Sequence, residues 1–215
     1  MTEATAAIPC SIPGARRLLA ISVASATPMT IDGRRILSGI AKQAVSTLAA
    51  PQRIAVRPLG VEGDEQADLS VHGGVSKAVY AYPHEHYAFW QTVRAQAGLQ
   101  AWGEELPPGM MGENLTVTGL LEADAHIGDV LRFPDCTLAI SEPRRPCYKF
   151  EARMGFKQAV KMMAQSGFCG YYLSVRSPGT LAAGEGFELV PGPREVSIRE
   201  LFRAKMRKES GGGGA

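Results

Sequence analysis

Short stretches rich in apolar and β-branched residues recur along the chain, and Gly, Pro, Asn or Asp separate them. This pattern is typical of short strands joined by tight turns. Asp32-Gly33, within residues 28–35, indicates a hairpin turn. Many short strands at close intervals predict a mainly β domain, either a barrel or a sandwich. The predicted strands are residues 18–24, 54–61, 78–82, 112–117, 127–133, 137–141, 170–175 and 187–190.

Three segments have helical periodicity, and we expect these helices at the periphery of the β domain. Residues 83–98 begin with Pro83, repeat apolar and aromatic residues at helical spacing and end at Gly98. Residues 156–166 end at Gly167, and we interpret their methionines as core packing. Residues 197–207 open with a capping box. The predicted organisation is a mobile lead-in at 1–17, one domain at 18–195, and a C-terminal helix with a flexible glycine tail at 196–215.

Composition and charge limit the classes of function. The chain is 45% hydrophobic and 20% charged, which are globular values. Its 23 basic and 21 acidic residues give a net charge of +2, which argues against a nucleic-acid or membrane-surface binder. No stretch approaches the roughly 18 apolar residues of a membrane span, and the N-terminal region makes a poor secretory signal. Four cysteines without a CxxC pair predict reduced thiols in a cytoplasmic protein.

Residues 141–150, SEPRRPCYKF, concentrate a thiol among fixed positive charges. Cys147 has Arg144, Arg145 and Lys149 as close neighbours in sequence. Cationic neighbours favour the thiolate, which is the form that attacks electrophiles and binds metals. The two prolines predict a stiff, non-helical loop that holds the sulfur in place. The alternative is a buried core cysteine near solvated arginines.

Residues 61–80 form a second dense region, in which His72, Gly73, Gly74 and Lys77 follow an acidic run. Paired glycines let the backbone approach a ligand and expose N–H groups that can hold an anion. The alternative is a plain strand connection with a hydrogen-bonded histidine. His84 and His86, at the start of the next helix, do not form HExxH, and a zinc site that combines them with a cysteine lacks the usual ligand spacing.

Three motifs in this order resemble the MOSC family, the domain at the C-terminus of molybdenum-cofactor sulfurases. They are GDEQADLSVHGGVSKAVYAYPHEHYAFW, GENLTVTGLLEADAHIGDVLRF and SEPRRPCYKF. The resemblance covers roughly residues 18–190 and is strongest for the stand-alone bacterial YiiM-like branch. It implies a MOSC-type β-barrel, related to the pyruvate-kinase insert domain and surrounded by helices. Proteins of this branch usually continue into a small helical C-terminal domain, of which this chain keeps only 197–207.

The resemblance implies a bound molybdenum cofactor, with molybdenum held by Cys147 and by a pterin dithiolene. A thiolate is a soft donor suited to a metal that sulfur already holds. Candidate partners for the cofactor's phosphate are Gly73, Gly74, Lys77, Arg144, Arg145 and Lys149. His72 and Asn114 are candidates for positioning a substrate or a metal-bound oxygen.

The implied function is reduction of N-hydroxylated compounds, such as hydroxylaminopurine-like bases. The chain has no flavin or nicotinamide fingerprint and no cysteine cluster for iron and sulfur, so the electrons are expected from a separate redox protein. A second hypothesis is a module that carries the cofactor, or sulfur as a Cys147 persulfide, without turnover. A third is a purely structural domain. The sequence leaves the physiological substrate, the electron donor and a homodimer open.

Overall fold

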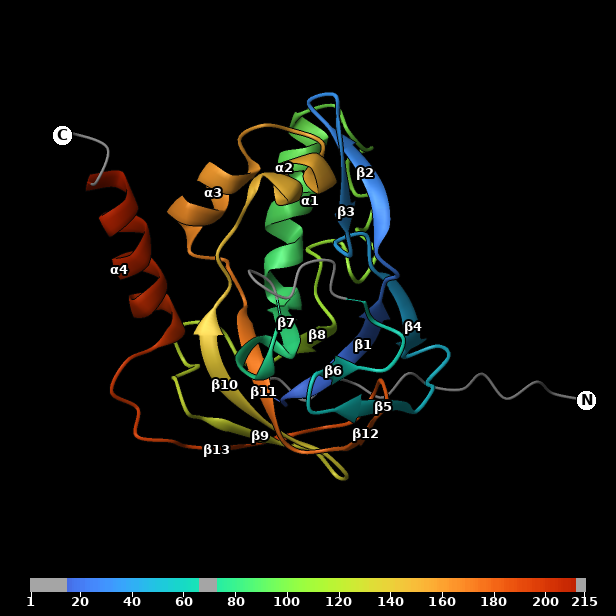
Figure 1. The fold of residues 1–215 in the computed structure, drawn as a ribbon, viewed down its shortest axis with the longest axis vertical. Coiled ribbons are helices and arrows are strands. Elements are labelled where there is room, and N and C mark those ends of the chain that lie inside the picture. Colours follow the sequence, from blue (N-terminus) through green and yellow to red (C-terminus); the bar gives the residue numbers. More distant parts are fainter. Residues whose placement is uncertain (1–14, 66–72, 212–215) are drawn as a thin grey trace, which may run out of the picture.

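The computed structural model describes residues 15–65 and 73–211 of the chain. Eight strands form the largest sheet, in the order β13-β9-β10-β11-β7-β8-β1-β4 (Figure 1). Neighbouring strands pair antiparallel except β7 and β8, which are parallel. The prediction of a mainly β fold is therefore confirmed. The strands of this sheet are β1 (Arg17–Val23), β4 (Gln43–Thr47), β7 (Val79–Pro83), β8 (Leu115–Thr118), β9 (Val130–Arg132), β10 (Thr137–Pro143), β11 (Tyr171–Ser177) and β13 (Glu188–Val190).

Two small sheets complete the strands. One pairs β12 (Gly179–Leu181), β5 (Ile54–Arg57) and β6 (Gly60–Val61). The other is the hairpin of β2 (Thr27–Ile31) and β3 (Arg34–Ser38). Asp32 and Gly33 join its strands with φ values of 48° and 75°, and such positive φ values at both central residues suit a tight hairpin turn. The hairpin expected from Asp32-Gly33 is confirmed.

The helices lie around the large sheet. Figure 1 shows α1 (Tyr87–Gln96), α2 (Tyr148–Met154) and α3 (Ala159–Ser166) gathered at one end of it, while α4 (Ile198–Gly211) stands apart beside β10. Trp90 of α1 is fully buried, and its ring meets that of Phe150 of α2 edge to face. Because aromatic pairs add to the burial of apolar area, this contact holds α1 and α2 together.

The start of α4 confirms the expected capping box. The Glu200 backbone N–H donates to Ser197 Oγ at 3.2 Å, and the Ser197 N–H donates to Glu200 Oε2 at 2.9 Å. Two backbone donors that the helix leaves without partners are therefore satisfied. Ile198 and Phe202 bury the inner face of this helix.

The two edges of the large sheet, β13 and β4, do not pair with each other. Backbone hydrogen bonds nevertheless join the segment before β13 to the start of β1. The Leu18 N–H donates to the Glu185 carbonyl at 2.9 Å, and the Gly184 N–H donates to the Leu18 carbonyl at 2.7 Å. The sheet is therefore mixed and curved toward closure at one point, and a closed barrel stays a prediction.

Three of the expected elements differ in the structure. Residues 54–61, predicted as one strand, form β5 and β6, which pair antiparallel across the turn at Pro58 and Leu59. Residues 141–150 are not one stiff loop, because β10 extends to Pro143 and α2 begins at Tyr148. Proline restricts the residue before it and not the second residue after it, so Tyr148 is free to start a helix. The expected helix at 83–98 starts instead with the 3₁₀ turn η2 (His84–His86), and α1 begins at Tyr87.

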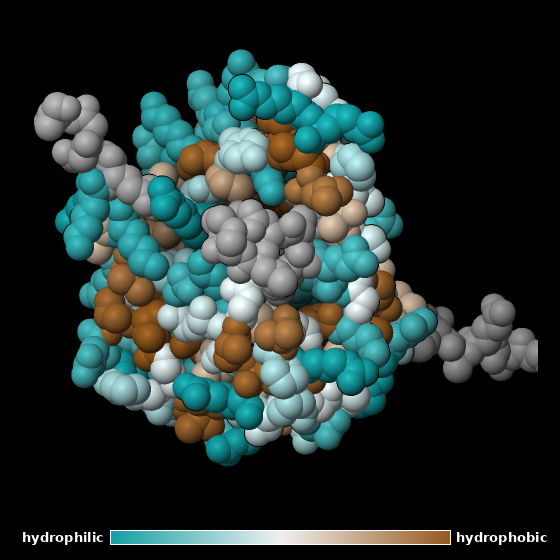
Figure 2. Space-filling view, in the orientation of Figure 1, coloured by the Kyte–Doolittle hydropathy of each residue, from teal (hydrophilic) through white to brown (hydrophobic). Residues whose placement is uncertain are grey.

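Figure 2 shows one face of the molecule, on which apolar residues form several separate patches among hydrophilic ones. Scattered patches of this kind are normal on a protein surface. No helix in the described part of the chain has both the length and the apolar character needed to cross a membrane.

Candidate functional site

A pocket of about 110 Å³, here called the Cys147 pocket, lies between the end of β3, strands β7 and β11, and the start of α2. Six of the nine predicted site residues line it, namely Gly73, Lys77, Asn114, Arg144, Cys147 and Lys149. Gly73 and Cys147 are 74 positions apart (147 minus 73), and the fold brings them to one cleft. The expectation that the Gly-Gly turn and the cysteine segment share a cleft is therefore confirmed for Gly73.

The other three predicted residues are placed differently. Gly74 precedes the 3₁₀ turn η1 (Val75–Lys77) and is not among the residues that line the pocket. Arg145 is exposed and also lies outside the lining. His72 falls outside the described residues. The functional roles of all nine residues stay predictions.

Cys147 stands at the N-terminus of α2, half-buried and with extended backbone at φ −138° and ψ 171°. Its carbonyl accepts the Phe150 N–H at 2.8 Å, which starts the helix immediately after it. Cys136 and Cys169 are buried instead, and burial raises the pKa of both thiols, that of Cys136 to about 11. A raised pKa means little thiolate near neutral pH. Among the described cysteines, Cys147 alone lines the pocket.

Arg144 is the fixed cation beside this thiol. Its side chain is buried, and Nη1 donates to the Met111 carbonyl at 3.0 Å. The guanidinium lies 4.9 Å from the ring centre of Tyr80 and 5.0 Å from that of Phe150. Burial opposes the charge, but attraction to nearby ionisable groups, Cys147 among them, outweighs it and raises the pKa of Arg144. The same attraction favours the thiolate form at Cys147.

Lys77 and Lys149 are partly exposed cations on the wall of the pocket. Lys77 Nζ lies 3.9 Å from Glu142 and 6.0 Å from the ring centre of Tyr172. Lys149 Nζ donates to the Leu37 carbonyl at 3.2 Å, which ties α2 to the β2–β3 hairpin. Each ammonium has three N–H groups, which is the chemistry that an anion in the pocket would need.

A buried polar network that we did not predict as part of the site also reaches the pocket. Lys42 forms an ion pair with Asp64, and their side chains are 8% and 5% exposed. Asp64 Oδ2 accepts a hydrogen bond from Asn114 Nδ2 at 2.8 Å. All three residues line the pocket, as do Tyr80 and Tyr172. No local pattern predicts this ion pair, because Lys42 and Asp64 are 22 positions apart.

Asn114 lies at the centre of this network. Its Oδ1 accepts the Tyr80 N–H at 3.1 Å, and its Nδ2 also donates to the Ser22 carbonyl at 3.2 Å. The amide therefore makes three bonds within the protein and fixes Asp64 against β1 and β7. The role of Asn114 in positioning a substrate or a metal-bound oxygen stays a prediction. The structure shows that its amide is bonded to Asp64.

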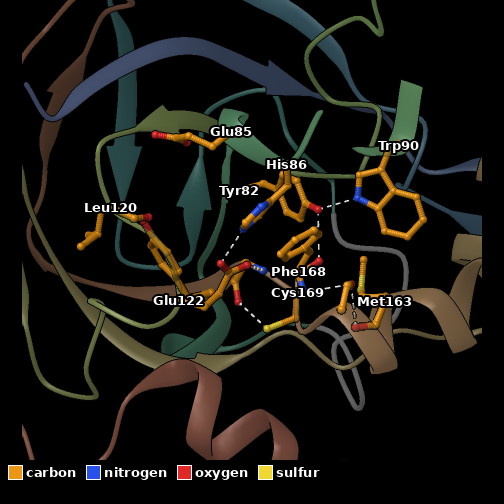
Figure 3. A network of polar contacts seen from close by, with 12 residues as sticks. Tyr82, Glu85, His86, Trp90, Leu120, Glu122, Met163, Phe168 and Cys169 are labelled. Atoms are coloured by element: carbon orange, nitrogen blue, oxygen red, sulfur yellow. Dashed lines mark hydrogen bonds and ion pairs between the residues drawn. The ribbon is translucent and has the colours of Figure 1, made fainter. Parts of the chain in front are cut away.

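A second buried network lies elsewhere in the fold (Figure 3). His86 Nε2 and Glu122 Oε2 are 2.7 Å apart, and the Phe168 ring stacks on the His86 ring at 3.8 Å. Glu122 Oε1 accepts the Gly170 N–H at 2.8 Å. None of these residues lines the Cys147 pocket. Among the described residues, no cluster of three His, Cys, Asp or Glu side chains could hold a metal ion.

Comparisons with known proteins agree with the motifs. The family model of the MOSC domain matches residues 68–188. The uncharacterized protein YflK of Bacillus subtilis is 34% identical over 183 residues, which are 85% of this chain and 77% of that protein. A protein named Reductase from Gibberella moniliformis is 33% identical over 158 residues, which are 68% of this chain and 26% of that protein.

Among solved structures, YiiM from Geobacillus stearothermophilus superimposes with a TM-score of 0.68 at 27% identity. The match covers 90% of this chain and 85% of that one. The chain therefore belongs to the MOSC domain family and is a YiiM-like member of it.

Proposed function

We propose that this protein is a molybdenum-cofactor-dependent reductase of N-hydroxylated compounds, such as hydroxylaminopurine-like bases. The observation that carries this proposal is the half-buried Cys147 thiol, which lines a pocket beside the fixed charge of Arg144. Family membership supports it, because the MOSC domain takes its name from molybdenum-cofactor sulfurases. The fungal relative named Reductase supports an oxidoreductase role.

The donor set of the pocket fits such a cofactor. Cys147 offers a soft sulfur ligand for molybdenum, while Lys77 and Lys149 offer N–H donors to a phosphate. Of the two acidic residues in the lining, Asp64 is neutralised by Lys42. The net charge of the lining is therefore positive, which suits an anionic cofactor. When bound, the cofactor would supply two-electron redox chemistry at the metal.

The protein's own residues would bind and orient the reactants. Arg144 holds a permanent charge against the thiol, and its buried contacts keep that charge in one place. Tyr172 contributes an aromatic side chain to the lining, against which a planar base can stack. Electrons would come from a separate redox protein, because the sequence carries no flavin, nicotinamide or iron–sulfur fingerprint of its own.

The alternative is a carrier of the cofactor, or of sulfur as a Cys147 persulfide. The partial exposure of Cys147 supports it, because a carried group must be reached by a partner protein. Turnover separates the two functions. A carrier binds the cofactor in a ratio near one but does not reduce an N-hydroxylated base with an artificial electron donor.

The decisive experiment uses protein from cells that synthesise the cofactor, with protein from cells that cannot synthesise it as the control. Molybdenum per protein and the reduction of an N-hydroxylated base by a reduced viologen dye are both measured. We expect a ratio near one and turnover only in the first preparation. A ratio near zero would refute the reductase and the cofactor carrier and leave only the persulfide carrier, and a ratio near one without turnover would favour the cofactor carrier.

We also infer that the large sheet is the barrel of the family, completed where residues 184–187 bond to the start of β1. A cytoplasmic location is the inference from the cysteine pattern, since Cys136, Cys147 and Cys169 are free thiols.

A further inference from the structure

Lys42 is a buried cation that faces the Cys147 pocket and that the proposed function does not yet use. Its side chain is 8% exposed, and its ammonium pairs with Asp64. An ammonium has three N–H groups, and among the described residues the hydrogen bond of Lys42 goes to one carboxylate oxygen of Asp64. Because Lys42 lines the pocket, its remaining donors are in reach of a molecule bound there.

Asp64 is held so that it fixes the position of this lysine. Its Oδ1 accepts the Ala24 N–H at 2.9 Å in addition to the Lys42 ammonium, and its Oδ2 accepts Asn114 Nδ2 at 2.8 Å. Asn114 in turn is anchored to the backbone of β1 and β7. Lys42 is thus oriented by a carboxylate that cannot rotate without losing buried hydrogen bonds, which cost free energy when they are left unmade.

We propose that Lys42 is the proton donor of the pocket and that Asp64 and Asn114 are its positioning residues. This inference rests on the proposed function. In the reaction R–NHOH + 2e⁻ + 2H⁺ → R–NH₂ + H₂O, the N–O bond breaks and the oxygen ends as water. The two electrons come from the separate redox protein. The Lys42 ammonium gives one proton to that oxygen, and solvent supplies the second proton to the nitrogen. The neutral Lys42 amine then regains its proton from solvent.

The other proton-bearing groups of the pocket are less suited to this role. The Tyr80 hydroxyl donates to the Cys169 carbonyl at 2.8 Å, and burial raises the pKa of Tyr80 and of Tyr172. A raised pKa makes a phenol a poorer acid near neutral pH. Lys77 and Lys149 lie on the partly exposed wall, against Glu142 and the Leu37 carbonyl.

The surroundings of Lys42 also bring its acidity closer to the working range. Burial lowers the pKa of Lys42, the charges of Asp64 and Glu113 raise it, and that of Arg144 lowers it, with a net lowering. General acids work best when their pKa lies near the ambient pH. A lysine with a lowered pKa is a better acid than an exposed lysine, and it stays active only below that pKa.

The test compares Lys42→Met and Lys42→Arg with the wild type, all purified with cofactor and assayed with an N-hydroxylated base and a reduced viologen dye. Lys161→Met, on the exposed face of α3, is the matched control and should keep the wild-type rate. We expect Lys42→Met to lower kcat on the order of 100-fold with little change in KM, as for loss of a general acid. Lys42→Arg should not restore kcat, because an arginine keeps the charge but does not release its proton.

The dependence of kcat on pH distinguishes a proton donor from a residue with only a structural role, because loss of a structural residue would not change the shape of this profile. The wild-type kcat should fall as pH rises through the Lys42 pKa, and this fall should be missing in Lys42→Arg. If Lys42→Met fails to fold, Lys42→Met combined with Asp64→Asn removes the unpaired buried carboxylate and gives the same comparison.

The outcomes separate the two proposals. Wild-type protein that carries molybdenum but does not turn over overturns the proposed function and this inference together. If the wild type turns over and Lys42→Met matches it, the inference alone is wrong. Full kcat in Lys42→Arg also overturns it, because the lysine would then supply only charge. Molybdenum content, measured for each variant, shows that a lost rate is not a lost cofactor.

Discussion

Replacing Glu122 by alanine should destabilise the fold far more than replacing Glu85, although each carboxylate takes part in two hydrogen bonds. Glu122 is fully buried, and its oxygens lie 2.7 Å from His86 Nε2 and 2.8 Å from the Gly170 nitrogen. Glu85 is exposed, and one of its oxygens accepts bonds from Thr118 Oγ1 and the Gly119 N–H, both at 2.7 Å. The pair therefore separates the effect of burial from the number of bonds.

The magnitude follows from the groups left behind. Glu122→Ala leaves the His86 ring nitrogen and the Gly170 N–H buried without this partner, and each costs about 1–3 kcal/mol. Their sum is roughly 2–6 kcal/mol. For a chain of this length, about 4 kcal/mol corresponds to a fall in Tm of roughly 8–16 °C. Glu85→Ala should cost less than about 1 kcal/mol, because water replaces the lost carboxylate.

The assay is a thermal melt of the wild type and both variants in the same buffer, with urea unfolding to give the free energies. A Tm for Glu122→Ala within about 3 °C of that for Glu85→Ala would refute the reasoning, since roughly 1 kcal/mol would then cover the whole difference. Such a result would mean that water enters the site and satisfies the freed groups.

Three further predictions concern the pocket and its thiol. Cys147→Ala and Cys147→Ser should both abolish reductase activity and change the free energy of unfolding by less than about 1 kcal/mol. Cys169→Ala should keep activity and lose roughly 1–2 kcal/mol of stability, because Cys169 is fully buried. A fully active Cys147→Ala with cofactor bound would contradict this prediction. Iodoacetamide at pH 8 should modify Cys147 before Cys136, as read by peptide mass spectrometry. The pKa of Cys136 is raised to about 11, so only about one thiol in a thousand is ionised there, and faster labelling of Cys136 would contradict the assignment. Gly109→Ala should lower stability by about 1–3 kcal/mol, because the φ of Gly109 is +84° and a Cβ would lie 2.9 Å from the Lys42 carbonyl oxygen. An unchanged Tm would contradict this prediction and show that the segment around Gly109 can move away from Lys42.

The strands that consist of short apolar runs were the part of the fold best predicted from sequence. The apolar run at 18–24 became β1, and the run at 78–82 became β7, whose five residues are all buried. Which strands pair was not predictable from these runs. The parallel contact of β7 with β8 depends on the path of the chain through α1 and the loop after it, and no local pattern encodes that path.

The missed helix α2 has a different cause. The prolines at 143 and 146 favoured the prediction of an extended segment. Their restriction of the backbone dihedral angles no longer applies from Cys147 onward. From Tyr148 onward an acidic residue in the first turn, Glu151, and a glycine after Met154 favour a short helix. Because seven residues are too few for a clear period, the buried contacts of Phe150 and Met154 decide the structure.

The site residues that could be predicted from the sequence are those with unusual neighbours along the chain. The residues that were missed acquire their partners only through folding. Cys147 is recognisable from the arginines near it in sequence, and Gly73 is recognisable from the glycine that follows it. Lys42 looks like any isolated lysine until the fold brings Asp64 and Asn114 to it from positions 22 and 72 residues away (64 minus 42 and 114 minus 42).

The cations of the pocket, predicted as one group, divide into two kinds once their surroundings are known. Arg144 is buried between two aromatic rings, and a bond to the Met111 carbonyl anchors it, so its charge acts on Cys147 from a fixed place. Lys77 and Lys149 are partly exposed, and their flexible stems can follow an anion as it binds. Under the proposed function, the fixed charge of Arg144 would act on the Cys147 sulfur before the cofactor binds, and the two lysines would adjust to the phosphate of the bound cofactor.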